Sequence, residues 1–309
     1  MPYKTIRNVR NSIEKKLKEL GLHNWDPVQW FIKTKHHTYY SFCQDKKGEK
    51  YFFKARIMDD EKVKKCFRRE FWFFKYARRI PFSRLSFTTH RLLKGGTSHR
   101  LDWMLLDYIK GQPMGDPNKE KKALKLEYIP FLVKNILDIQ KHLTRYLLQL
   151  PGHNYWLENK GSFQNYKKII ESYISSRISN KEKKLIERIL KDNRNLLNKS
   201  ARVISHADLN PKNILLINSK KTAIHDWEHV HLNNKAYDFA LLWVTGWRSA
   251  EWRDKLLKEI LKHTQNKKEF MSLFRIGILL FSLKEIKYGP PRGRSVQLRT
   301  FHKYLYHLS

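Results

Sequence analysis

The chain has 309 residues, with 63 Lys or Arg against 29 Asp or Glu, so its formal net charge is +34 and its isoelectric point about 10.1. Its 41% hydrophobic and 13% aromatic content supplies a sizeable core and suits two lobes. Only Cys43 and Cys66 are cysteines, which excludes a disulfide framework or a zinc ribbon and favours a reducing compartment.

Apolar residues recur every three to four positions from Ile6 to Leu20, which predicts an opening amphipathic helix that ends at Gly21. Strand and turn signals follow at residues 30–32, 39–42, 45–48 and 51–55. A second helix is predicted from about Glu61 to Arg78, because its apolar residues share one face. The first third of the chain is therefore expected to be β-rich with two helices.

The remainder of the chain is predicted to be mainly helical. One more apolar strand is expected from Trp103, leading into a short connection that ends at Gly111. Helical periodicity then covers residues 123–150 (interrupted at Pro130), 163–178, 181–197, 238–245, 252–263, 270–286 and 296–308. This order of elements gives an α+β class.

No segment of the sequence suggests a membrane anchor or a secretion signal. The longest apolar run, residues 276–283, is far shorter than the roughly 20 residues that cross a bilayer. The first residues are not followed by the apolar stretch of a signal peptide. We therefore expect a soluble, cytoplasmic protein without a transmembrane segment.

Two short polar segments interrupt apolar runs in the second half of the chain. Residues 205–216 read Ser-His-Ala-Asp-Leu-Asn-Pro-Lys-Asn-Ile-Leu-Leu, and residues 225–228 read His-Asp-Trp-Glu. The first has the H-x-D-x-x-x-x-N spacing of a kinase-like catalytic loop. Phosphoryl transfer needs one carboxylate to accept a hydroxyl proton, and an amide and a second carboxylate to hold Mg²⁺. The alternative is a surface turn whose Asp and Asn cap helices, which does not explain why these residue types stand between apolar runs.

These two segments resemble the aminoglycoside phosphotransferase and choline kinase superfamily, whose members show H-G-D-L-H-P-x-N and I-D-W-E or I-D-F-E. The resemblance implies a two-lobed protein-kinase-like fold. Residues 1–106 would form a small β-rich N-lobe that binds the nucleotide phosphates, and residues 107–113 a hinge. Residues 114–309 would form a helical C-lobe with the catalytic loop and the acceptor site.

The resemblance also implies roles for individual residues of the motif. Asp208 would be the catalytic base, and His206 would order the loop. Asn213 and Asp226 would be the Mg²⁺ ligands. Asp238 matches an aspartate that begins the next helix, so we expect it to be structural, as a helix cap or as a partner for the catalytic loop.

By the same resemblance, Lys54 lies on the third strand, where the family keeps a lysine for the α- and β-phosphates of the nucleotide. Glu70 lies where the family keeps the ion-pair partner of that lysine, with Glu61 as the alternative. The hinge that would meet the adenine is formed by Leu106, Asp107, Tyr108 and Ile109.

The sequence departs from the family pattern in the phosphate-covering loop. Residues 33–38 contain no glycine, although glycine is what lets backbone N–H groups approach phosphates closely. Side chains would then have to cover the phosphates, and the candidates are Lys33, Lys35, His36 and Thr38.

A second departure is His225, which stands where the family has an aliphatic residue. It could contact a phosphate or ribose oxygen, or orient a metal ligand. We favour a buried, hydrogen-bonded ring but keep His225 among the candidate nucleotide contacts. A zinc site with His229 and His231 is discounted, because the strand is expected to end between them.

The positive charge permits two interpretations of comparable weight. It could reflect an AT-rich coding bias, or it could attract an anionic partner. After Glu285 no acidic residue follows, whereas the later basic residues include Arg292, Arg294, Arg299 and Lys303. No zinc-finger, RNP-type or helix-turn-helix pattern accompanies the charge, so a nucleic-acid partner is not favoured.

The sequence therefore predicts a kinase that uses ATP (or GTP) and Mg²⁺ to phosphorylate a hydroxyl of a small-molecule acceptor. The positive charge of the protein would suit an anionic acceptor. The alternative is a kinase-like protein with weak or no activity that binds RNA, ribosomes or anionic membranes. An atypical protein kinase of the Rio type is disfavoured, because no A-P-E-like activation segment is present.

Overall fold

The computed structural model describes residues 3–24, 31–33, 38–56, 61–98, 101–117, 124–153, 157–219 and 221–308. The chain divides into two compact units. The first contains Met1–Pro81, Thr89–Lys110 and His225–Glu228, and the second Phe82–Thr88, Gly111–Ile224 and His229–Ser309. The first is β-rich and the second mainly helical, which confirms the predicted α+β class.

The first unit is built on a six-stranded sheet of order β1-β3-β4-β7-β6, in which β2 also pairs with β3. All its pairings are antiparallel. Its strands are β1 (His23–Asn24), β2 (Phe31–Lys33), β3 (Thr38–Gln44), β4 (Lys50–Arg56), β6 (Leu92–Ser98) and β7 (Leu101–Asp107). The predicted β3–β4 hairpin is confirmed, whereas β6 was not predicted.

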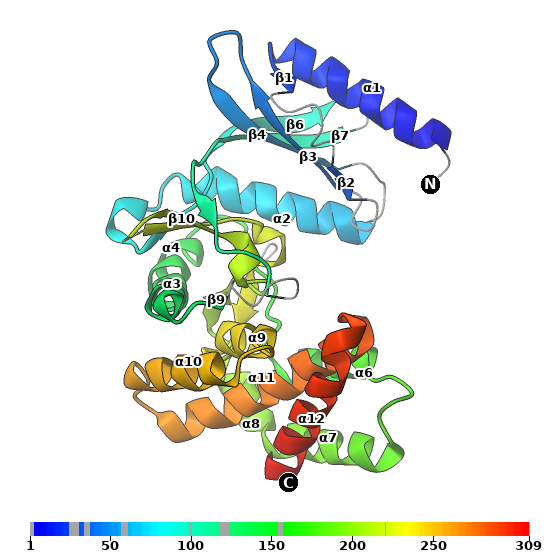
Figure 1. Ribbon diagram of the computed structural model, residues 1–309, viewed down its shortest axis with the longest axis vertical. Coiled ribbons are helices and arrows are strands. Elements are labelled where there is room, and N and C mark those ends of the chain that lie inside the picture. The colour runs from blue at the N-terminus through cyan, green and yellow to red at the C-terminus, as the bar shows by residue number, and fades with distance from the viewer. Residues whose placement is uncertain are drawn as a thin grey trace. The chain divides into compact units, whose positions relative to one another are not determined.

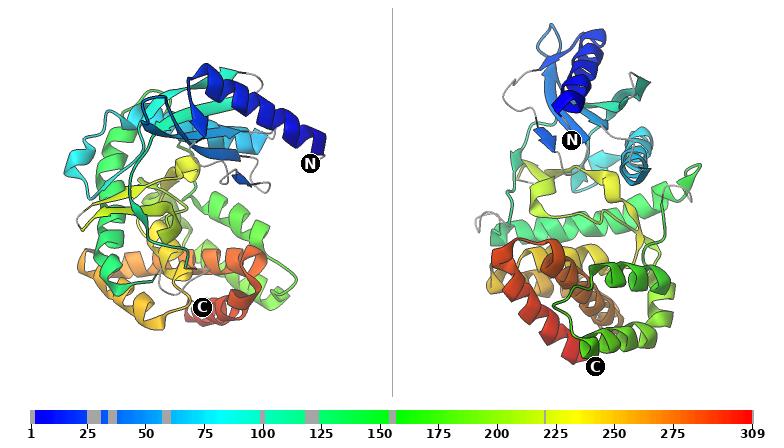
Figure 2. Two further views of the ribbon diagram at one scale, coloured as in Figure 1. Left: turned by 45° about the horizontal axis from the view of Figure 1, so that its top comes forward. Right: turned by 90° about the vertical axis from the view of Figure 1, so that its right-hand side faces the viewer.

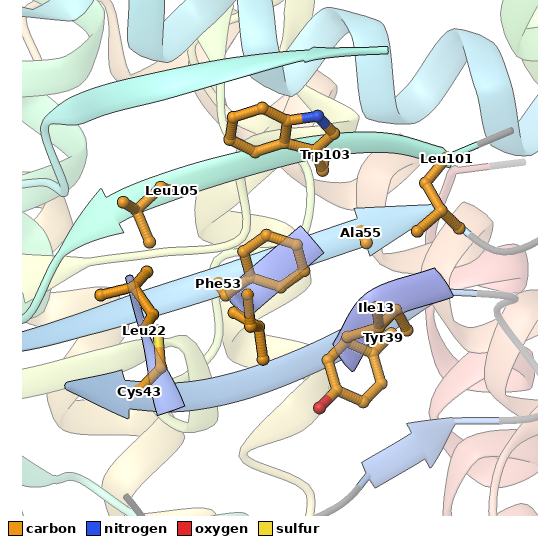
Figure 3. Close-up of a cluster of buried hydrophobic side chains, with 10 residues drawn as sticks. Ile13, Leu22, Tyr39, Cys43, Phe53, Ala55, Leu101, Trp103 and Leu105 are labelled. Carbon is orange, nitrogen blue, oxygen red and sulfur yellow. The ribbon is translucent and has the colours of Figure 1, made fainter. Parts of the chain in front are cut away.

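Helix α1 (Tyr3–Glu19) packs on one face of this sheet, and α2 (Glu61–Ala77) lies on the other (Figure 1). Figure 3 shows the core on the α1 face, a cluster in which Ile13 lies beside Tyr39 and to which Phe53, Ala55 and Trp103 also belong. Because side chains alternate along a strand, Lys54 points to the opposite face, which α2 covers. The period of β4 therefore directs this lysine toward Glu70.

The strands of the second unit form a four-stranded sheet of order β5-β11-β10-β8 and a separate pair, β9 with β12. Their bounds are β5 (Phe87–Thr88), β8 (Gln112–Pro113), β9 (Val203–Ser205), β10 (Ile214–Asn218), β11 (Lys221–Ile224) and β12 (His231–Asn233). The motif loop, residues 206–213, connects β9 to β10. It is thereby held between two strand systems.

The α-helices that the structure describes in the second unit are α3 (Ile129–Asp138), α4 (Thr144–Leu147), α6 (Phe163–Tyr173), α7 (Asn180–Asp192), α8 (Arg194–Ser200), α9 (Tyr237–Thr245), α10 (Ala250–Lys262), α11 (Lys267–Tyr288) and α12 (Pro291–Leu308). Figure 2 shows α11 and α12, in orange and red, packed together. Pro130 lies in the first turn of α3, a position that tolerates proline, so it begins this helix rather than interrupting it. The helix predicted over 181–197 divides at Asn193. No helix within the described ranges is long and apolar enough to span a membrane.

Candidate active site

The motif loop is anchored by Asp238, a fully buried residue in the first turn of α9. Its carboxylate accepts hydrogen bonds from the backbone N–H groups of His206 and Ala207, both at 2.9 Å. Burial raises the pKa of Asp238 to about 7, although these two N–H groups act in the opposite direction. The N-cap of α9 is Ala236, so Asp238 is the loop partner that the sequence suggested and not a helix cap.

Asp208 projects from this loop with its carboxylate held in one orientation. The Nδ2 of Asn213 donates to Oδ2 at 2.9 Å, and the Nδ2 of Asn210 lies 3.3 Å from Oδ1. Both amides also donate to the Asp208 carbonyl, and Lys212 Nζ lies 3.5 Å from Oδ2. The Asp208 side chain is still 21% exposed, so the carboxylate is oriented but accessible from solvent.

The backbone of the loop carries a strained residue. His206 is fully buried, and its Nδ1 accepts from the backbone N–H of Asp208 at 3.3 Å, as a loop-ordering side chain would. Ala207 between them has φ 65°, the left-handed conformation that favours glycine. Glycine is the residue that the H-G-D motif has at this position.

A second group of charges lies within the first unit, around Lys54. Its Nζ forms an ion pair with Glu70 of α2 and lies 3.2 Å from Asp226 Oδ1 and 3.6 Å from Glu228 Oε2. The alternative partner, Glu61, instead pairs with Lys64 at 2.8 Å. The structure thus brings Lys54, Glu70 and Asp226 together and adds Glu228, to which we assigned no role.

This group has more negative than positive charge. Burial opposes the charge of Lys54, but Glu70, Tyr40, Asp226 and Glu228 raise its pKa well above the ordinary value. Glu70 shares this one cation with two other carboxylates. Burial and repulsion from these neighbours therefore raise the Glu70 pKa, while Lys54 lowers it.

Such a set of carboxylates is suited to a divalent cation. Glu70, Asp226 and Glu228 each offer an oxygen, and these oxygens lie within 4.8 Å of one another. Mg²⁺ prefers oxygen ligands and is commonly held by one or two carboxylates. The donor chemistry and the excess negative charge both fit this ion, with Asp226 and Glu228 the more accessible ligands because Glu70 is buried.

Trp227 fixes the segment that carries Asp226. The indole is fully buried, stacks on Phe73 with ring centroids 4.2 Å apart, and donates its Nε1–H to Thr89 Oγ1 at 3.0 Å. Its backbone N–H donates to Glu70 Oε1 at 3.2 Å. Asp226 has φ 68°, a conformation common at functional sites when the surroundings enforce it.

His225 departs from the interpretation that we favoured. The residue is half-buried and not buried, so the burial that we predicted for its ring is wrong. His225 belongs to the first unit and directly precedes Asp226. That it contacts the nucleotide stays a prediction.

The predicted hinge residues make contacts within the protein through both side chains and backbone. Leu106 is buried in β7. The Asp107 carboxylate accepts from Arg91 N and Nε at 2.7 and 2.8 Å, and hydrogen bonds from His90 and Arg91 lower its pKa against the effect of burial. The Tyr108 ring packs edge-on against Phe42. The Asp107 backbone is engaged as well, since its N–H donates to Arg91 O at 3.1 Å and its carbonyl oxygen lies 2.7 Å from His90 Nδ1. The contact of this segment with the adenine stays a prediction.

Two predictions lie beyond what the structure describes. Residues 34–37 of the glycine-free loop, with Lys35 and His36, fall outside the described residues, as do the side chains of Lys33 and Thr38. Asn213 belongs to the second unit and Asp226 to the first. Their sharing of one Mg²⁺ stays a prediction.

Comparison with known proteins places the chain among phosphotransferases. The model of the phosphotransferase enzyme family matches residues 82–271. A search of curated proteins gives no significant match. These residues are more than half of the chain, and they include the motif loop and the segment that carries Asp226.

Solved structures share the fold at low identity. An amicoumacin kinase in complex with AMP-PNP, Ca²⁺ and Ami aligns over 99% of this chain and 95% of its own, with 11% identity and a TM-score of 0.58. Aminoglycoside phosphotransferase APH(4)-Ia aligns over 97% and 98%, with 15% identity and a TM-score of 0.58. The streptomycin–ATP complex of APH(2″)-IIa aligns over 95% of both chains, with 14% identity and a TM-score of 0.53.

Proposed function

The chain belongs to the phosphotransferase enzyme family, and we propose that it moves the γ-phosphoryl group of ATP (or GTP) to a hydroxyl of a small-molecule acceptor. The observation that carries this proposal is the Asp208 carboxylate, oriented by Asn210 and Asn213 on a loop anchored to Asp238. The nucleotides AMP-PNP and ATP in complexes of similar fold support the choice of donor.

Asp208 would act as the general base. Its carboxylate accepts the acceptor's hydroxyl proton while the hydroxyl oxygen forms a bond to the γ-phosphorus, and the bond to the β–γ bridging oxygen breaks to leave ADP or GDP. Asn210 and Asn213 hold both carboxylate oxygens, so little orientational freedom is lost on reaching the transition state. His206 and Asp238 keep the loop backbone in place.

The first unit would supply the phosphate contacts. Lys54, oriented by Glu70, presents its ammonium to the α- and β-phosphates. Asp226 and Glu228, with Asn213 from the second unit, would hold Mg²⁺. This ion would supply neutralisation of the phosphate charge. The backbone of 106–109 would meet the adenine, and His225 is a further candidate contact to the nucleotide.

A screen of hydroxyl acceptors with labelled ATP tests the proposal. Wild type should phosphorylate at least one acceptor class, and Asp208→Asn should lower kcat by roughly 10²–10⁴, the usual contribution of a general base. The affinity for Mg·ATP, measured by calorimetry, should change little, because the phosphate and metal contacts remain. Asp192→Asn, an exposed position at the end of α7, is the matched control. A kcat within a few-fold of wild type in Asp208→Asn would remove the base assignment.

The net charge of +34 favours one alternative, a basic module that binds RNA, ribosomes or anionic membranes. The same charge would equally suit an anionic acceptor. Tight, saturable RNA binding at physiological salt, together with no transfer to any acceptor in the screen, would decide for the module. Phosphoryl transfer that Asp208→Asn slows by roughly 10²–10⁴ would decide for the enzyme.

A further inference from the structure

One face of α12 is exposed and carries only positive charge. The helix packs against α11 and lies at the edge of the second unit, in red in Figure 2. Its exposed charged side chains are Arg292, Arg299 and Lys303. Because an α-helix has about 3.6 residues per turn, positions separated by seven and by four residues lie on the same side. The three cations therefore form a row along the helix, called here the α12 stripe.

Acidic side chains of the described residues do not neutralise the α12 stripe. Helix α12 contains no acidic residue, and within the described part of the chain no carboxylate forms an ion pair with any of the three cations. The carboxylate of α7 that reaches α12 is Glu182, and it is bound to His302 and Ser179. By contrast, the surface of α10 holds two lysine–glutamate ion pairs. The stripe is thus a row of cations whose charge an external anion can balance.

An exposed aromatic residue continues this row. Tyr306 lies three residues after Lys303, on the same side of the helix, and is 55% exposed. Its ring also lies beside His302, with the ring centroids 6.4 Å apart. From residue 292 to residue 306 the helix rises by about 21 Å. Cations in a row beside an exposed aromatic ring are what single-stranded nucleic acids require, because the cations follow the phosphates and the ring stacks on a base.

The packing of α12 distinguishes between the two extended anions that such a face could meet, a lipid surface and a nucleic acid. A helix that lies in a bilayer surface inserts its apolar side into the membrane. In α12 that side is already used in the protein core, where Phe301 and Leu305 are fully buried. Two of the three cations are arginines, whose planar guanidinium matches phosphate oxygens and stacks on aromatic rings. Both observations favour a nucleic acid.

We propose that the α12 stripe and Tyr306 bind a single-stranded nucleic acid, with the cations on its phosphates and the tyrosine ring stacked on one base. Phosphate contacts and stacking carry little sequence information, which agrees with the lack of a nucleic-acid motif in the chain. This surface uses none of the residues assigned to phosphoryl transfer, so the inference does not depend on the proposed function.

Fluorescence anisotropy of a labelled uridine oligonucleotide of about 12 nucleotides tests the proposal on the full chain. The salt concentration is varied over about 50–200 mM, and saturating Mg·ADP occupies the predicted nucleotide site. Each phosphate contact with a single strand contributes about −0.7 to the slope of log K against log salt concentration. The triple variant Arg292→Gln, Arg299→Gln and Lys303→Gln loses three contacts, so its slope should be flatter than that of wild type by about 2.

The matched control removes the same charges from the first unit. Lys75, Arg78 and Arg79 are exposed at the end of α2, and they again comprise two arginines and one lysine. Lys75 and Arg79 both lie over the ring of the half-buried Tyr76, so this cluster offers no comparable ring to a base. Replacing all three basic residues by glutamine should change the slope by less than about 0.7, the contribution of one contact.

Variants of Tyr306 separate stacking from charge. Tyr306→Ala should weaken binding about fivefold or more without changing the salt slope, because it removes stacking on one base and no charge. Tyr306→Phe keeps the ring and should bind within about twofold of wild type. Circular dichroism verifies that the variants are folded.

Three results would overturn the proposal. The first is an equal flattening of the slope in the two triple variants, which would indicate general attraction to a basic protein. The second is the absence of oligonucleotide binding at about 50 mM salt. The third is sedimentation with phosphatidylserine vesicles that the α12 triple variant abolishes, without binding of the oligonucleotide, since this would make the face a lipid site.

Discussion

Replacing Ala207 by glycine should make the protein more stable. Ala207 holds φ 65°, and a left-handed conformation costs an L-residue about 1–2 kcal/mol. Glycine removes this cost but gives the unfolded chain more freedom, which offsets about 0.4–1 kcal/mol. It also loses a mostly buried methyl group, which offsets up to about 0.8 kcal/mol more. The hydrogen bond from the residue 207 N–H to Asp238 is a backbone interaction and survives the change. We expect the free energy of unfolding to rise by up to about 1 kcal/mol, the net of these three terms.

Urea unfolding followed by tryptophan fluorescence measures this difference. Ala207→Val should be destabilising, because a β-branched residue tolerates positive φ worse than alanine. The control is Ala236→Gly, a fully buried alanine with φ −90°, which should lose about 1 kcal/mol or more from chain entropy and the lost methyl group. If Ala207→Gly is as destabilising as Ala236→Gly, the backbone at 207 stores no strain.

Three further predictions concern other parts of the chain. Asp226→Ala should abolish Mg²⁺-dependent nucleotide binding in calorimetry, and unchanged Mg·ATP affinity would remove the metal assignment. Gly95→Ala should cost about 1–3 kcal/mol of stability from overpacking, because a Cβ there would collide with the Phe71 ring, whereas Gly96→Ala meets open space and should be nearly neutral in the same thermal melt. Against burial, hydrogen bonds from Ser179 and the charge of His302 lower the pKa of Glu182. The ionised Glu182 carboxylate therefore stabilises the fold at a pH above the ordinary glutamate pKa, and this stabilisation is lost as the pH falls through the lowered pKa of the folded state. Glu182→Gln should accordingly reduce the loss of stability at acidic pH in a curve of unfolding free energy against pH.

The sequence predicted the elements whose signals are local. The strand signals of β3 and β4 and the helical period of α2 were sufficient to predict these elements, whereas the pairing of Lys54 with Glu70 came from the family resemblance. The spacing in the motif loop put Asp208 and Asn213 on one short turn. These patterns are dictated by backbone geometry, which a single chain displays directly.

The features that were missed depend on tertiary contacts. Strand β6 was not predicted because Gly95 and Gly96 suggest a turn, although Gly95 is what lets the Phe71 ring approach the sheet. Glu228 drew no assignment, although its position two residues after Asp226 was the available signal.

The division of the chain has a consequence for the order in which the protein can be completed during synthesis. Four residues near position 226 belong to the first unit although more than a hundred residues separate them from Lys110. Until they leave the ribosome, the space beside Phe73 and Thr89 lacks its tryptophan, and Glu70 lacks the backbone donor at residue 227. The N-terminal unit cannot therefore finish folding on its own during translation, and a fragment ending at residue 110 would expose an unfilled apolar surface. The motif loop precedes residue 225 in the chain and is therefore synthesised first. The charged group around Lys54 can form only after both the motif loop and residues 225–228 have been synthesised.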